Sequence, residues 1–334
     1  MNPNDLVRIA VDAMSGDGGS AVSLEACRLA LTRDPQLRLL LVGDSERLAD
    51  TMTAWPDGVR NRIDLLTAGS TLPADAGPAI ALRRGADSSM GVCLSLVADG
   101  SAEAAVSAGS TGALMVLARH LLGMLPGIDR PALMAALPTA SGTAWMLDLG
   151  ANLEVDARRL CEFARLGHVA VSALNGRPPA IGLLNIGVEP NKGPDRVREA
   201  GRRIEAIEGL DYRGFVEADQ VFAGTVDLVV CDGFSGNVLL KSAEGAVRMM
   251  FGELRTAFAG SLCGLMARSR LRRLHDSLDP ARHNGAPMLG VRGTVIKSHG
   301  GASASGLAHA VGLAALEARR GLVAALEKQL WAQD

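Results

Sequence analysis

The sequence contains few cysteines and very few lysines. Its five cysteines are far apart, include no Cys-x-x-Cys pair, and lie at Cys27, Cys93, Cys161, Cys231 and Cys263. This argues against a disulfide framework or a zinc site and favours a reducing, cytoplasmic compartment. Lysine occurs only four times, and the other 30 of the 34 basic residues are arginine. Each lysine can therefore be examined individually.

Neither an excess of charge nor a long apolar run is present. With 34 basic and 36 acidic residues the formal net charge is −2, which gives no electrostatic footprint for a nucleic-acid partner. No apolar stretch reaches the roughly 18 to 20 residues that a membrane-spanning helix needs. The first residues, MNPNDLVRIAVDAM, lack a basic stretch followed by an apolar one, so we expect no signal peptide.

Nucleotide-binding signatures and metal-ligand spacings are also missing. The chain has no G-x-x-x-x-G-K-[ST] loop and no G-x-G-x-x-G fingerprint with its acidic partner. Its acidic residues form no metal-ligand pattern. We therefore expect no metal and no nucleotide cofactor, and a small oxyanion such as phosphate is the better candidate ligand.

Short apolar runs alternate with helical patterns along most of the chain. Most runs are continuous, as in strands buried on both faces of a sheet. The runs expected to be strands are Val7–Val11, Leu37–Val42, Arg62–Leu66, Ala104–Val106, Ala132–Ala136, Trp145–Leu149, Ala180–Asn185 and Val226–Cys231. The amphipathic segments between them include Ser20–Arg33, Ser88–Asp99, Thr111–Leu125 and Glu154–Leu174. This order predicts an α/β fold with a mainly parallel sheet, in one domain over residues 1–334.

Polar, glycine-rich turns separate these elements. A single such turn can need glycine for its geometry alone. Six of them, however, carry small or polar residues that let backbone N–H groups approach an anion, and three open helices. Because ligands of open α/β sheets bind beyond the carboxyl ends of the strands, we expect these turns to surround one anion. The turns are residues 12–20, 107–112, 150–152, 185–193, 231–237 and 296–301.

Three of the four lysines lie in or just after these turns. Lysine is a compact charge whose pKa shifts readily, so Lys192, between Asn191 and Gly193, is the strongest candidate. Lys241 lies further into its helix and is better explained by a solvated helix face. His299, within a glycine-rich turn, can bind an anion or transfer a proton. Cys231 ends an apolar run and is interpreted as a small buried residue rather than a nucleophile.

The segment Ala246–Leu274 has a different character. Apolar residues recur in it at helical spacing, and the basic stretch Arg268–Arg273 follows. Three interpretations stay open: a core-facing helix with a solvated charge run, a partner helix in a dimer, or an interfacial helix on anionic lipid. It lies in a helical amphipathic insertion expected at about residues 237–282. The residues expected to contact a membrane or an acyl chain are Met250, Phe251, Leu254, Phe258, Leu262 and Met266.

A series of motifs, in order from about residue 7 to 314, resembles the PlsX-type phosphate acyltransferases of bacterial phospholipid synthesis. The motifs are Val11-Asp-Ala-Met, Asp87-Ser-Ser-Met90, Ser107-Ala-Gly-Ser-Thr-Gly-Ala-Leu-Met115, Asp148-Leu-Gly-Ala-Asn152, Gly182-Leu-Leu-Asn-Ile-Gly187, Cys231-Asp-Gly-Phe-Ser-Gly-Asn-Val238, Gly285-Ala-Pro-Met-Leu-Gly290 and Ile296-Lys-Ser-His-Gly300. Three features depart from the family pattern. Ser15-Gly-Asp-Gly-Gly-Ser20 replaces Gly-Gly-Asp followed by proline, Ser110 stands where the family has asparagine, and a lysine common before Asp87 is missing.

The resemblance implies transfer of a long-chain fatty acyl group from acyl carrier protein to inorganic phosphate, giving acyl phosphate. It also implies a three-layer α/β/α homodimer, akin to phosphate acetyltransferases and the isocitrate/isopropylmalate dehydrogenase group. The resemblance further implies a cytoplasmic protein that makes peripheral contact with the membrane. It would pass its product to a glycerol-3-phosphate acyltransferase.

The residues and the resemblance together give a hypothesis for the site. Phosphate attacks the thioester directly, Lys192 and His299 balance its charge, and Asn185 or Asn237 donates to the developing oxyanion. The phosphate-binding residues expected are Ser107, Gly109, Ser110, Thr111, Gly112, Gly233, Ser235, Gly236 and Lys297, and the loop acids that cap helices or brace loops are Asp12, Asp17, Asp148 and Asp232. Two alternatives remain: a phosphate acetyltransferase-like enzyme that uses coenzyme A thioesters, and a non-catalytic acyl- or lipid-binding regulator.

Overall fold

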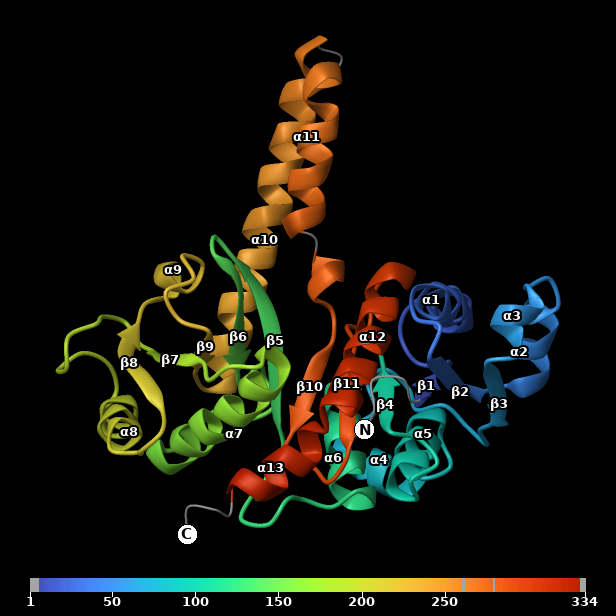
Figure 1. Ribbon diagram of the computed structural model, residues 1–334, viewed down its shortest axis with the longest axis horizontal. Coiled ribbons are helices and arrows are strands. Elements are labelled where there is room, and N and C mark those ends of the chain that lie inside the picture. The colour runs from blue at the N-terminus through green and yellow to red at the C-terminus, as the bar shows by residue number, and fades with distance from the viewer. Residues whose placement is uncertain (1–5, 260–261, 279, 331–334) are drawn as a thin grey trace.

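One eleven-stranded sheet with helices on both faces forms the body of the molecule (Figure 1). The computed structural model describes residues 6–259, 262–278 and 280–330, except for the side chains of residues 262–266, 275–277, 280–281 and 330. The strand order is β3-β2-β1-β4-β11-β10-β5-β6-β9-β7-β8. The strands are β1 (Val7–Asp12), β2 (Leu37–Gly43), β3 (Ile63–Thr67), β4 (Ala104–Ser107), β5 (Ala132–Thr139), β6 (Gly142–Leu147), β7 (Ala180–Leu184), β8 (Asp211–Val216), β9 (Leu228–Val230), β10 (Ala286–Leu289) and β11 (Thr294–Lys297).

The helices of the described part cover both faces of this sheet, which confirms the predicted three-layer α/β/α class (Figure 1). They are α1 (Gly19–Arg33), α2 (Ser45–Met52), α3 (Asp57–Arg60), α4 (Pro78–Arg84), α5 (Ser89–Ala98), α6 (Thr111–Leu121), α7 (Ala157–Asn175), α8 (Asp195–Glu205), α9 (Ala218–Val221), α10 (Gly233–Phe258), α11 (Leu262–Leu278), the 3₁₀ helix η1 (Pro280–His283), α12 (Ala304–Arg320) and α13 (Leu322–Leu330). Each of the four helices expected from the sequence is present, with ends that differ from the prediction by at most four residues.

Strand direction reverses in the middle of the sheet. β1, β2, β3, β4 and β11 are mutually parallel, and β6, β7, β8 and β9 form a second parallel group. Between the groups, β10 is antiparallel to β11 and to β5, and β5 is antiparallel to β6. The two groups therefore point in opposite directions, and their carboxyl ends lie at opposite edges of the sheet. The mainly parallel sheet is confirmed, but the expectation that all six turns share one edge is wrong.

Three strands were not predicted from the sequence. β10 and β11 have four residues each beside glycine-rich turns, and β10 contains Pro287, a residue that argues against a central strand. β8 is the last strand in the sheet order and has an exposed, polar start, Asp211, so it lacks the continuous apolar run of a buried strand. The two antiparallel pairings of β10 cancel in direction, so the reversal itself arises where β5 pairs with β6.

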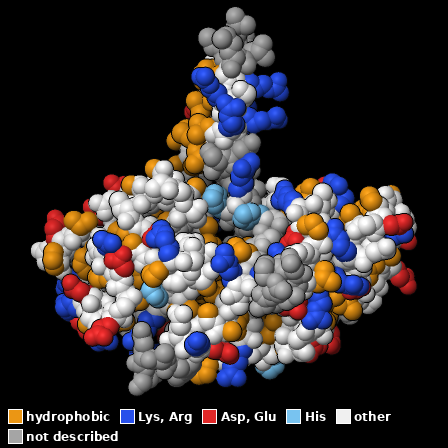
Figure 2. Space-filling model, in the orientation of Figure 1, with side chains coloured by type: hydrophobic (Ala, Val, Ile, Leu, Met, Phe, Trp, Pro, Cys, Tyr) orange, Lys and Arg blue, Asp and Glu red, His pale blue; other side chains and the backbone are white. Residues whose placement is uncertain are grey.

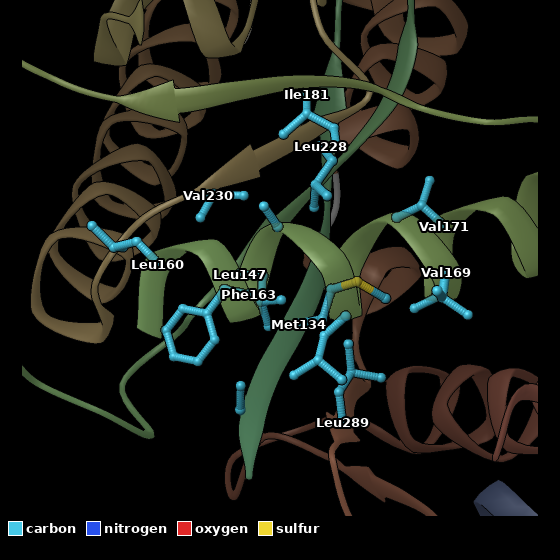
Figure 3. Packing of buried hydrophobic residues seen from close by; sticks show 14 of the residues in the cluster. Met134, Leu147, Leu160, Phe163, Val169, Val171, Ile181, Leu228, Val230 and Leu289 are labelled. Atoms are coloured by element: carbon cyan, nitrogen blue, oxygen red, sulfur yellow. The ribbon is translucent and has the colours of Figure 1, made fainter. Parts of the chain in front are cut away.

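Side chains alternate between the two faces of the sheet and build a core on each. Along β5, Met134 packs with α7, α8 and α13, whereas Leu133 packs with α5 and α6. Figure 3 shows the first of these cores, in which Phe163 of α7 lies beside strand residues such as Leu147 and Val230. On the second face, α9 and α10 cover β5, β6 and β9 and contribute Val221 and Leu239. α6 and α10 thus lie on the same face, over different halves of the sheet.

The helices α10 and α11 project from the body as a hairpin (Figure 1). They fall on the segment for which a helical insertion was expected, and α10 begins at Gly233 because the Asp232 side chain caps its first turn. Within the described ranges, no helix is long and apolar enough to cross a membrane.

Candidate active site

The turns after β1 and β4 are joined through a buried carboxylate. Asp12, at the end of β1, accepts hydrogen bonds from the backbone N–H groups of Met14 and Ser15, both 3.2 Å, and from the Ser107 hydroxyl at 2.7 Å. The Ser107 oxygen in turn accepts the N–H of Gly109 at 3.1 Å. Asp12 is only 1% exposed, so it acts as a brace that fixes the 107–112 turn.

The turn after β11 packs against the same two turns. The N–H of Asp17 donates to the carbonyl of Gly300 at 2.9 Å, and Ser298 donates to the carbonyl of Ser107 at 2.9 Å. Gly16 has a φ of +95°, and a Cβ there would lie 3.0 Å from that of Ala108. Only glycine fits this contact, so residues 12–20, 107–112 and 298–301 form one interlocked edge of the sheet.

The N-terminus of α6 lies in this edge with its backbone donors open. Ser110, its N-cap, makes no side-chain capping bond, and its hydroxyl points instead to the carbonyl of Ala76 at 3.5 Å. A Cβ on Gly112 would meet no atom within 4 Å. The ends of α1, α4 and α8 are also uncapped, whereas α5, α7, α10 and α12 each have a side chain on an N-terminal N–H. Free N–H groups, a helix dipole and open space suit a small anion.

Basic side chains gather next to this helix end. Lys241 of α10 brings its Nζ to 3.3 Å from Nε2 of His299 and to 3.1 Å from the carboxylate of Glu244. Lys297 ends β11 opposite Ser107 in the ladder, and its ammonium donates to the carbonyl of Ser298. Lys241, which the sequence pattern assigned to a solvated face, is indeed exposed but also contacts His299.

The electrostatic environment favours different charge states for the lysines and for His299. Burial, aided by the positive charge of Lys241, lowers the pKa of Lys297 to about 8, although Asp17 opposes this. Burial and Lys241 also lower the pKa of His299, which favours its neutral form. The Nδ1 atom of His299 accepts the N–H of Gly301 at 3.1 Å. Positive charge for an anion here comes from the lysines rather than from His299.

Two positioning residues were missed in the sequence. The side-chain oxygen of Asn284 accepts the backbone N–H of His299 at 2.9 Å, and its side-chain amide donates to the Ser298 hydroxyl at 2.8 Å. Asn284 therefore holds the turn after β11. Ser15 is 7% exposed and its hydroxyl has no partner, while a Cβ on Gly109 would lie 3.1 Å from it. Asn284 carried no signal beyond its place before Gly285. For Ser15, the departure from the family's glycine was the available signal.

At the opposite edge, Asp148 braces the turn after β6. It is fully buried and accepts backbone N–H groups from Leu133 at 2.9 Å, Leu149 at 2.7 Å and Asn152 at 2.6 Å. Burial raises the pKa of this carboxyl, against the opposing effect of these hydrogen bonds. Its surroundings are those of a structural acid, because all of these donors come from its own turn and from the neighbouring strand β5.

The N-terminus of α10 is already occupied by protein groups. Gly233 donates its N–H to the carbonyl of Asn152 at 2.8 Å, and Ser235 donates to the Asp232 carboxylate at 2.7 Å. Phe234 and Gly236 donate to backbone carbonyls as well. The hypothesis that the N–H groups of Gly233, Ser235 and Gly236 hold phosphate is therefore contradicted. A Cβ on Gly236 would lie 2.1 Å from the carbonyl oxygen of Asp148, so close packing explains this glycine.

The turn after β7 holds Asn185 and Lys192 away from His299. Asn185 donates to the carbonyl of Lys192 at 3.1 Å and packs on Gly193, so it shapes its own loop. Lys192 is exposed and has no ion-pair partner among the described residues. The preceding strand, β7, points the opposite way from β11 and lies five positions from it in the sheet. The role expected for Lys192 stays a prediction.

Asn237 links the two edges. It is exposed on α10, and a Cβ on Gly150 would lie 3.8 Å from the Cβ of Asn237. Lys241 follows four residues later, so the two side chains share a helix face, about 6 Å apart along the axis. This helix face extends from the turn after β6 to the lysines beside α6. Asn237 is the side-chain amide closest in sequence to the basic cluster.

A cysteine nucleophile and a metal centre find no support here. Cys231 is buried, burial raises its thiol pKa, and its Sγ faces the carbonyl of Asp148 at 3.5 Å. The described residues contain no cluster of histidine, cysteine or acidic side chains that could hold a metal ion. The basic groups beside the α6 N-terminus can bind an anion and transfer a proton.

Comparison with known proteins decides the family. A family model described as "Fatty acid synthesis protein" matches residues 7–324. The phosphate acyltransferase of Pseudomonas syringae pv. syringae (strain B728a) is 45% identical over 326 residues, 96% of each chain, and that of Nitrosococcus oceani is 46% identical over 319 residues, 94% of each. The chain belongs to the phosphate acyltransferase family. The resemblance found in the sequence motifs is confirmed.

Solved structures outside the phosphate acyltransferase family share the fold. A phosphotransacetylase from Streptococcus pyogenes has a TM-score of 0.62 at 19% identity, with 94% of each chain covered. A 4-hydroxythreonine-4-phosphate dehydrogenase from Klebsiella pneumoniae has a TM-score of 0.57 at 14% identity, with 94% of this chain and 99% of the other covered. At these identities the likeness supports the α/β/α architecture only.

Proposed function

We propose that the protein transfers a long-chain fatty acyl group from acyl carrier protein to inorganic phosphate and so forms acyl phosphate for phospholipid synthesis. The observation that carries this proposal is the uncapped N-terminus of α6 beside Lys241 and Lys297, in a chain whose relatives are named phosphate acyltransferases. Open backbone donors and two lysines fit a phosphate dianion. That the transferred group is an acyl group is inferred from the names of the relatives.

In the proposed reaction, phosphate bound at Ser110–Gly112 attacks the thioester carbonyl directly. Lys241 and Lys297 balance its charge, and Asn237, on the same face of α10 as Lys241, donates to the developing oxyanion. Lys192 and Asn185 lie at the other sheet edge, so any contact they make is with a different part of the long acyl donor. No enzyme-bound acyl group is needed, in keeping with the burial of Cys231.

A thiol-release assay tests this function. The full chain is incubated with palmitoyl-acyl carrier protein or with palmitoyl-coenzyme A and acetyl-coenzyme A, each with and without inorganic phosphate, and the free thiol is measured. We expect phosphate-dependent release with the carrier protein thioester above all. Preference for a coenzyme A thioester would favour a phosphate acetyltransferase-like enzyme, and binding without any thiol release would favour a non-catalytic regulator.

We further propose that the hairpin of α10 and α11 contacts anionic lipid from the cytoplasmic side. Basic side chains gather along the hairpin beside an apolar strip (Figure 2). On α10, Met249 is 68% and Met250 41% exposed, whereas Phe251, Leu254 and Phe258 are only half-buried. The side chains of Leu262 and Met266 lie outside the described part. Exposed apolar groups next to arginines suit an interfacial helix.

Removing charge from the hairpin should weaken membrane contact. The four exposed arginines of α11, at positions 268, 270, 272 and 273, are replaced by alanine, and flotation with vesicles of anionic lipid is measured. At about 1 kcal/mol per basic residue, binding should fall more than a hundredfold. The variant should still turn over the soluble acyl carrier protein thioester. It should also keep the mass of a homodimer, which is part of the proposal. Unchanged flotation would contradict the lipid contact.

A further inference from the structure

Lys297 is a half-buried amine that lacks a carboxylate partner among the described residues. Its ammonium bonds to the carbonyl of Ser298, and no carboxylate of the described residues lies within ion-pair distance of it. The charged groups that face it are Asp17 from the turn after β1, Lys241 from α10 and the neighbouring His299. Glu244 and Asp12 are held by Lys241 and Ser107, respectively. Its charged form is therefore only weakly favoured, and burial with Lys241 brings its pKa to about 8.

The strand geometry points Lys297 toward the proposed reaction centre. Residues two apart on a strand face the same side, and Val295 packs in the core formed by α5 and α6. Lys297 therefore lies on the sheet face that α6 and α10 cover. Its strand neighbour is Ser107, the start of the turn that opens α6. The amine thus lies beside the phosphate-binding helix end and the Asn237–Lys241 face of α10.

We propose that Lys297 relays the proton from the attacking phosphate to the leaving thiolate. The step rests on the proposed function. An oxygen of HPO₄²⁻ forms a bond to the thioester carbonyl carbon, the carbon–sulfur bond breaks, and its electron pair stays on sulfur. The Lys297 ammonium gives that sulfur a proton, and the resulting amine takes the proton that phosphate loses as it becomes acyl phosphate. The products are the free thiol and the acyl phosphate dianion, so atoms and charge balance.

No other basic group of the cluster fits this role as well. His299 favours its neutral form, and its Nδ1 is engaged by the Gly301 N–H. Lys241 is paired with Glu244. A proton carrier works best when its pKa lies near that of the group it serves, and a thiol of about 8.5 lies close to the pKa of about 8 for Lys297.

The test compares two donors in the full-length enzyme. One is the acyl carrier protein thioester, and the other is an acyl thionitrobenzoate, whose far more acidic thiol leaves without a proton. We expect Lys297→Met to lower kcat roughly 30-fold with the carrier protein, below the usual ~10²- to 10⁴-fold range of acid catalysis because thiolates leave readily. With the aryl thioester at saturating phosphate the loss of kcat should be less than about threefold, while the lost phosphate contact should raise the KM for phosphate equally with both donors. Lys297→Arg should behave as Lys297→Met, because arginine stays protonated.

The pH profile gives a second readout. With the carrier protein, wild-type kcat should fall as pH rises through about 8, where Lys297 loses its proton, and this arm should be absent with the aryl thioester. Equal losses for both donors, or the same arm in both profiles, would overturn the relay and leave phosphate acyl transfer standing. Absence of phosphate-dependent thiol release by the wild type with either donor would overturn the proposed function and the relay together.

Discussion

Replacing Gly112 by aspartate is expected to raise the KM for phosphate about a thousandfold while the protein stays folded. A side chain at this position enters open space, and a carboxylate in the first turn of α6 stabilises the helix. The same carboxylate occupies the donors that phosphate needs. Two like charges about 4 Å apart at an effective dielectric constant of about 20 repel by about 4 kcal/mol, which is roughly a thousandfold in affinity.

Gly112→Asn is the matched control for this change. Asparagine has the same shape as aspartate but no charge, so it should raise the KM for phosphate far less. The phosphate dependence of thiol release and the thermal unfolding of both variants are measured. If the two variants show equal KM values, phosphate does not bind at the α6 N-terminus.

Replacing Lys241 by methionine is expected to lower kcat/KM for phosphate about a hundredfold, the loss typical of a charge-assisted hydrogen bond. The change also removes a positive charge that lowers the pKa of Lys297. That pKa should therefore rise, and the loss of activity at high pH should move to a pH above about 8. A purely structural role for Lys241 would not move the pH profile.

Lys328→Met provides the control for Lys241→Met. Lys328 is an exposed lysine near the end of α13, so its loss removes the same charge from the chain without touching the site. Its kcat/KM and pH profile should match those of the wild type. An unchanged pH profile in Lys241→Met, with kcat/KM close to that of the control, would contradict the placement of Lys241 in the phosphate site.

Local sequence patterns predicted most elements because each strand and helix is decided by nearby residues. Val7–Val11 and Leu37–Val42 are apolar except for one arginine each, and the structure places both in a mostly buried parallel group. The turn 107–112 was assigned to anion binding from its small and polar residues, and it does open a helix with free donors. β10 shows the limit, because four residues without a period give no signal of their direction.

Whether the sequence could indicate the role of a candidate site residue depended on whether that role involves long-range contacts. Gly233, Ser235 and Gly236 resemble an anion-binding turn in sequence, yet Asn152 and Asp232 already accept their neighbouring N–H groups. Lys241 looked like a surface residue, because its contact with His299 spans 58 positions. Neither result follows from spacing along the chain.

By itself, the sequence determined the α/β class, the family, the glycine-rich turns and the small set of lysines available to hold an anion. These are properties of local composition and of ordered motifs. Only the tertiary structure decided which turns meet. Three antiparallel pairings around β5 and β10 turn the second group of strands over, so Lys192 and His299 end at opposite edges of the sheet. α10 then crosses between the edges and brings Lys241 to His299, because eight residues of helix from Gly233 span about 12 Å.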